Sequence, residues 1–139
     1  MRRSRSAALS LIVLCSVLPW AEAPAVAAVA APTLTVDSAA LVADGAGVRV
    51  QLTATCAAGD EGGATPTVTQ AAGDRVAQGV KALGFICTGA PQQLSVLVVA
   101  DVRGAPFHAG TALVTADLSD CPGANCEHAT AERVLRIRR

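Results

Sequence analysis

Two cysteines and a histidine lie close together near the C-terminal end, in the stretch DCPGANCEHAT. Four residues separate Cys121 from Cys126, and His128 follows two positions later. Sulfur and imidazole ligands at such spacing suit zinc, for which Asp120 or Glu127 would supply a fourth ligand. A redox centre usually has two residues between its cysteines, so the spacing does not favour one. The remaining interpretation is a disulfide that closes a loop, and the compartment decides among the three.

The N-terminal residues have the order of a secretory signal peptide. Three arginines among the first five residues precede the apolar run AALSLIVLCSVL, and an alanine-rich stretch follows. The run is shorter than the roughly 20 residues of a membrane span. Cleavage is expected between Ala30 and Ala31, with cleavage after Ala27 or an uncleaved anchor as alternatives. We therefore expect a secreted protein with a signal peptide over residues 1–30 and one domain over residues 31–139.

The cysteine count agrees with export. Cys15 leaves with the signal peptide, so four cysteines remain in the domain. In a small exported domain this number implies two disulfides, with three possible pairings. We favour Cys56–Cys87 and Cys121–Cys126, because the first two cysteines each end a strand in phase with inward-facing residues. The turn residues of CPGANC also suit a bridged loop, and we expect no metal and no cofactor.

The sequence contains the residue types of a serine-hydrolase triad. The nucleophile would be Ser95 or Ser119, and neither lies in a nucleophile motif. His108 and Asp101 would complete the triad, but each of these residues is better explained as an ordinary strand or loop residue. We expect a protein that is not an enzyme.

Charge and composition exclude other classes. The segment GDEGG, Gly59–Gly63, together with Asp44 offers acidic oxygens but lacks the ligand spacing of a calcium loop, so a flexible acidic loop is expected. Without the signal peptide, 8 Lys+Arg stand against 10 Asp+Glu, a net charge of −2. This balance predicts no nucleic-acid partner. The domain contains two aromatic residues, Phe85 and Phe107, which counts against an apolar binding pocket. A basic cluster is confined to the last residues, Arg133, Arg136, Arg138 and Arg139.

Alternating apolar and polar residues predict the fold. In GVRVQLTATC the residues Val48, Val50 and Leu52 share one face, which indicates a half-buried strand. A turn at Asp44-Gly45 precedes it. Similar runs lie at 33–37, 47–56, 67–70, 93–102, 111–120 and 129–139, with one or two strands within 74–87 and a loop at 57–66. About seven short strands at regular spacing predict an all-β, two-layer antiparallel Ig-like sandwich, with a barrel as the alternative.

The leader, the APTLTVD start of the domain and the C-x4-C of Cys121 and Cys126 resemble small exported Ig-like β-sandwich proteins of actinobacteria. The chain is also similar to chromophore-binding apoproteins of the neocarzinostatin type. That resemblance implies a sandwich with two disulfides and an apolar ligand held in a cleft at one end. The match in residues is confined to the two cysteines, so it assigns no binding residue.

These observations predict a non-enzymatic binding or interaction module outside the cell. Its partner would be a protein or a component of the cell envelope, met by the loops at one end of the sandwich, CPGANC included, because loops on a rigid scaffold commonly carry binding. A small-molecule carrier is the alternative, and a secreted enzyme comes third. We expect a monomer, with no membrane insertion after cleavage.

Overall fold

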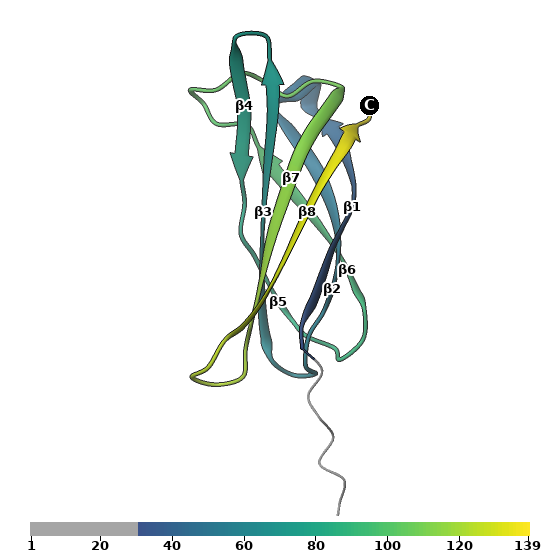
Figure 1. Cartoon of the computed structure of the whole chain (residues 1–139), viewed down its shortest axis with the longest axis vertical. Helices are drawn as coiled ribbons and strands as arrows, with labels where there is room; N and C mark the ends of the chain where they lie inside the picture. Colours follow the sequence, from purple (N-terminus) through teal and green to yellow (C-terminus); the bar gives the residue numbers. More distant parts are fainter. Residues whose placement is uncertain (1–30) are drawn as a thin grey trace, which may run out of the picture.

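The computed structural model describes residues 31–139, so the predicted signal peptide and Ala30 lie outside the described residues. The described chain is an all-β sandwich of two antiparallel sheets (Figure 1). Its elements are β1 (Thr33–Val42), η1 (Ala43–Gly45), β2 (Gly47–Thr55), β3 (Glu61–Ala72), β4 (Arg75–Val80), β5 (Leu83–Ile86), β6 (Gln92–Val99), β7 (Gly110–Cys121) and β8 (Glu127–Ile137). The predicted sandwich is confirmed, with eight strands because residues 74–87 hold two. Within residues 31–139 no helix is long and apolar enough to cross a membrane.

The two sheets differ in size. One has three strands in the order β1-β2-β6, and the other has the order β4-β3-β7-β8, with β5 also paired to β3. Predicted inward faces form the core between them. Leu52 and Leu118 are fully buried, one from each sheet. Other residues buried between the two sheets are Val48, Val50, Ala54, Leu94, Val96, Val98, Ala112, Val114, Ala116 and Ile137.

Three strand predictions were wrong in extent. The first strand continues past Asp37 to Val42, with a register shift between Val36 and Ser38. The acidic segment at residues 61–63 belongs to β3 instead of a loop, and pairs with both β5 and β7. The strand predicted over residues 93–102 is shorter, because β6 ends at Val99 and Val102 is 98% exposed.

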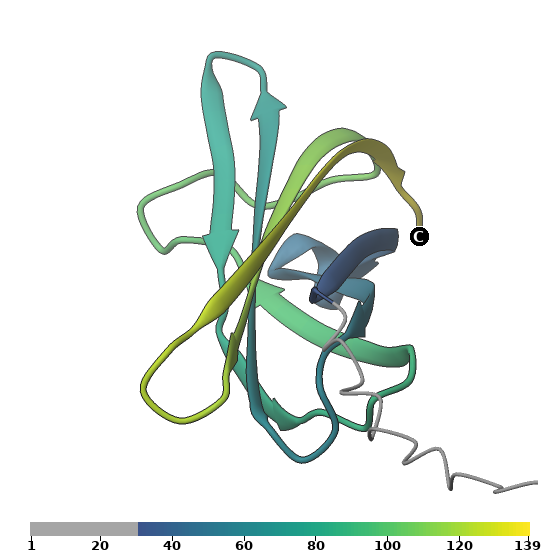
Figure 2. The same cartoon turned by 60° about the horizontal axis from the view of Figure 1, so that its bottom comes forward.

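The sandwich is closed along the side where β1 meets β8. The backbone N–H of Leu41 donates to the carbonyl of Arg138 at 2.7 Å, and the N–H of Arg138 donates to Ala39 at 3.2 Å. Further along, the Arg133 guanidinium donates to the carbonyls of Val36 and Asp37, at 2.8 and 2.9 Å. Figure 2 shows the C-terminal end of β8 beside β1. The bulge in β1 thus leaves carbonyls that a side chain from the second sheet satisfies.

The opposite side of the sandwich joins β6 to β4 through the loop that follows β6. The N–H of Asp101 donates to Gln78 at 2.7 Å, and the N–H of Ala105 donates to Val76 at 3.2 Å. These bonds lie beyond the end of β6. The contact between the two sheets on this side is therefore made by a loop instead of by paired strands.

Candidate functional site

Both disulfides lie at one end of the sandwich, at the bottom of Figure 1. Cys56 is bonded to Cys87 with Cα atoms 5.4 Å apart, and Cys121 to Cys126 with Cα atoms 4.0 Å apart, which is the pairing that the sequence favoured. Three loops, at 56–60, 87–91 and 121–126, meet there; together they are named the disulfide end. The first bridge connects the end of β2 to the end of β5, and so joins the two sheets.

A buried carboxylate packs against the inter-sheet bridge. Asp120 is 3% exposed, and its Oδ2 accepts a hydrogen bond from the backbone N–H of Ala57 at 3.1 Å. Its Oδ1 lies 3.9 Å from Sγ of Cys87. Asp120 directly precedes Cys121. Its hydrogen bond with Ala57 in the β2–β3 loop and its contact with Cys87 therefore connect the second disulfide to the first. From the sequence, Asp120 was expected only as a candidate metal ligand. Asp120 lies two residues after Leu118 in the same strand, and this spacing was the signal that both side chains point inward.

The sulfurs of this end are not available as ligands in the structure. Cys56, Cys87 and Asp120 lie together, but each sulfur is bonded to another sulfur and none is a thiolate. The same holds for the predicted zinc site at Cys121 and Cys126. Around that loop, Asp120 is buried whereas Glu127 and His128 are exposed. The disulfide end is therefore a surface of three loops held in place by two disulfides.

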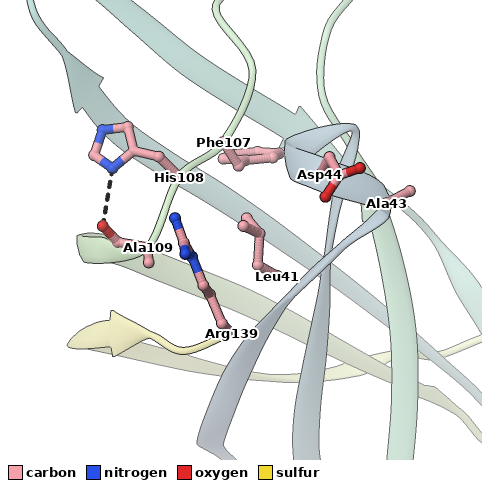
Figure 3. Close-up of a pocket in the computed structure, with 7 residues that line it drawn as sticks. All are labelled: Leu41, Ala43, Asp44, Phe107, His108, Ala109 and Arg139. Carbon is pink, nitrogen blue, oxygen red and sulfur yellow. Dashed lines mark hydrogen bonds between the residues drawn. The ribbon is translucent and has the colours of Figure 1, made fainter.

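The opposite end holds a hollow of about 510 Å³ between the β1–β2 turn and the residues before β7 (Figure 3). Its polar side chains are Asp44, His108 and Arg139. Both ring nitrogens of His108 face backbone carbonyls, those of Ala109 and Ala71, each at 3.1 Å. The imidazole is thus occupied by the protein's own backbone, and we assign it a structural role.

A buried glutamine fixes the backbone of His108. Gln70 is 2% exposed; its Oε1 accepts from the N–H of His108 at 2.9 Å, and its Nε2 donates to the carbonyls of His108 and Thr111 at 2.9 and 3.3 Å. Gln70 was not among the residues predicted from the sequence. An amide at the inward position two residues after buried Val68 was the available signal, because a buried polar side chain needs partners.

The side chains considered for a hydrolase are not brought together. Ser119 lies near the disulfide end, where its Oγ donates to the carbonyl of Gly63 at 3.4 Å. His108 lies at the opposite end. Ser95 accepts from Gln51 in mid-strand at 3.0 Å, and a carboxylate oxygen of Asp101 accepts from the N–H of Arg103 at 2.9 Å.

The considered calcium ligands are also divided between the two ends. Asp44 belongs to the turn between β1 and β2, beside the hollow in Figure 3. Residues 59–63 lie beside the inter-sheet bridge, where the N–H of Gly59 donates to the carbonyl of Cys87 at 2.9 Å. The two groups therefore do not form one site.

No protein-family model and no curated protein matches the chain. Among solved structures, the chain is similar to the solution structure of CsgH from R. palustris, with a TM-score of 0.45 and 16% identity. The similarity covers 74% of this chain and 91% of that chain.

Proposed function

We propose that the protein is an exported, non-enzymatic binding module whose contact surface is the disulfide end. The observation that carries the proposal is the convergence of both disulfides at one end, coupled through buried Asp120. Cross-linked loops lose little conformational entropy when a partner binds, so a surface of this kind favours recognition. The exposed positions at 122–128 would supply the contacts.

Export is part of the proposal. Two disulfides suit an oxidising compartment, and the leader has the order of a signal peptide. The partner would be another protein or a component of the cell envelope. The carrier function implied by the neocarzinostatin-type resemblance stays a prediction. A hollow of about 360 Å³ beside Phe85 and Ile86 is the candidate cleft for it.

Loop substitutions test the contact surface. Asn125→Ala, Glu127→Ala and His128→Ala together should weaken saturable binding of the full chain to envelope fragments of its natural host by about tenfold or more, because truncation of a single energetically dominant contact residue costs about 2 kcal/mol or more. All three residues are exposed, so the fold should remain intact. Binding is measured by co-sedimentation of the labelled protein.

The matched control changes exposed residues at the opposite end, Asp74→Ala with Arg103→Ala. This variant should bind like the unmodified chain. Equal binding by both variants, or the absence of saturable binding by the unmodified chain, would reject the disulfide end as the contact surface.

A further inference from the structure

Half of the positive charge of the domain lies at one end of the sequence. Of the 8 Lys+Arg in residues 31–139, four are within the last seven residues, as Arg133, Arg136, Arg138 and Arg139. The same range carries 10 Asp+Glu, so its net charge is −2. The arginines are therefore concentrated against the overall charge of the domain, and such a local excess of one sign attracts oppositely charged partners.

The strand register brings a further arginine to the same place. Ala40 of β1 pairs with Arg49 of β2 on one side, and with Arg138 through an isolated parallel bridge on the other. Paired residues of neighbouring strands direct their side chains to the same face of the sheet. All three residues are exposed, so Arg49 and Arg138 share one surface with only the methyl group of Ala40 between them.

Arg136 extends this group along β8. It precedes Arg138 by two residues, so the alternation of the extended chain places both side chains on the same face. Both residues line a hollow of about 540 Å³ between β1 and β8, together with Ser38 and Ala40. Arg49, Arg136 and Arg138 are named the arginine patch. It lies where the C-terminal end of β8 meets β1 (Figure 2), away from the disulfide end.

The hollow has an excess of positive charge. Its acidic residue, Asp37, has a carboxylate that accepts hydrogen bonds from the hydroxyls of Thr35 and Thr53, at 3.1 and 2.7 Å. Arg133 also lines the hollow, but its guanidinium donates to two carbonyls of β1 and is not counted in the patch. The guanidinium groups of the arginine patch are thus exposed to solvent beside a single carboxylate that is held by hydroxyls.

We propose that the arginine patch binds a flexible polymer that carries phosphate groups along its chain. A guanidinium presents its N–H donors in a planar fork, which pairs with two oxygens of one anion. A carboxylate is satisfied by one such fork, whereas a phosphate group has further oxygens for a second arginine. The backbones of Arg49 and Arg138 are roughly 10 Å apart, because neighbouring strands are about 4.8 Å apart. A phosphate group over Ala40 would accept from both, and Arg136 would bind the next group along the polymer.

The composition favours such a polymer over a nucleic acid. Binding of single-stranded nucleic acid relies on aromatic side chains that stack on the bases. Phe107 is 2% exposed, and Phe85 packs against Gly62 at the disulfide end, so neither adjoins the patch. The polymer is therefore bound through its phosphate groups. This inference does not rest on the proposed function of the disulfide end.

Fluorescence anisotropy of end-labelled inorganic polyphosphate tests the proposal with the purified protein. Arg49→Gln with Arg138→Gln should raise the dissociation constant about tenfold or more at about 0.15 M salt, because two bidentate, charge-assisted contacts are lost together. The dependence of the logarithm of this constant on the logarithm of the salt concentration should become shallower by roughly 1.4, since each contact to a flexible chain contributes about 0.7.

The matched control removes the same charge elsewhere, as Lys81→Gln with Arg103→Gln, at two exposed residues outside the patch. This variant should bind polyphosphate like the unmodified chain. Arg49→Lys with Arg138→Lys keeps the charge but not the planar forks, and should restore only part of the affinity. Far-ultraviolet circular dichroism should be the same for all variants, because every substituted side chain is exposed.

Nuclear magnetic resonance of the unmodified chain provides a measurement that needs no variant. On titration with inorganic pyrophosphate, the amide resonances of Ala40 and Arg138 should shift, and those of residues 121–126 should not. The absence of saturable polyphosphate binding, an equal loss in the control variant, or full restoration by the lysine variant would overturn the proposal. Duplex DNA bound as tightly as polyphosphate, with the same dependence on the two arginines, would assign the patch to nucleic acid and overturn it as well.

Discussion

Replacement of both Cys56 and Cys87 by alanine is expected to lower the free energy of unfolding by about 3.7 kcal/mol, the chain-entropy value for a closed loop of about 32 residues. Both cysteines are buried, at 3% and 2% exposure, and the bridge joins β2 to β5 across the two sheets. The variant should lose a large fraction of the stability of a small domain, since such domains are typically stable by about 5–15 kcal/mol.

The second disulfide provides the matched control. Cys121→Ala with Cys126→Ala opens a loop of about six residues, for which the same relation gives about 2.2 kcal/mol. Urea unfolding followed by far-ultraviolet circular dichroism measures both variants. If the Cys121–Cys126 variant were the less stable of the two, the inter-sheet bridge would not be the main staple of the fold.

Phe107→Ala should be the most damaging single change in the core, with a loss of about 3–5 kcal/mol. Phe107 is 2% exposed, and its backbone N–H donates to the carbonyl of Gly45 at 2.9 Å. It belongs to the core at the end opposite the disulfides, so the substitution would leave a cavity where neither bridge constrains the chain. The same unfolding measurement reports the loss.

Phe85→Ala is the control for this prediction, because Phe85 has the same side chain but is only partly buried. It should cost less than Phe107→Ala. A larger loss at Phe85 would show that the core is centred nearer the disulfide end than the burial of the two rings indicates.

Local patterns in the sequence were sufficient to predict most strands of the sandwich and the residues that each strand buries. In β2, β6 and β7 the alternation is strict, since one face packs against the opposite sheet and the other meets solvent. Val50 and Val114 are buried because alternation with a period of two places them on the face that packs against the opposite sheet. The disulfide pairing was accessible for the same reason, because Cys56 continues the inward phase of β2.

Two glycines made the start of β3 difficult to predict from the sequence. Gly62 and Gly63 indicated a loop by composition, yet both lie in the strand. A Cβ at Gly62 would lie 2.8 Å from Cζ of Phe85 and 3.0 Å from Sγ of Cys87, so the glycine makes room for a ring and a bridge that come from another strand. This requirement depends on residues more than twenty positions away and leaves no local pattern.

The buried polar residues were missed for a related reason. Gln70 and Asp120 occupy inward positions, but their acceptors and donors come from loops distant in the sequence. The alternation of a strand shows that such a side chain is buried, but it does not show which group forms a hydrogen bond with it. The hydrogen bonds that join the loop after β6 to β4 likewise depend on strand order, which alternation does not specify.

The mass of the intact protein recovered from the medium of its natural host shows whether the chain is an exported domain held by two disulfides. The expected chain begins at Ala31, and its mass rises by four hydrogens on full reduction, one pair for each bridge. A protein that keeps residues 1–30 and whose mass does not change on reduction would contradict both the export and the stapled fold.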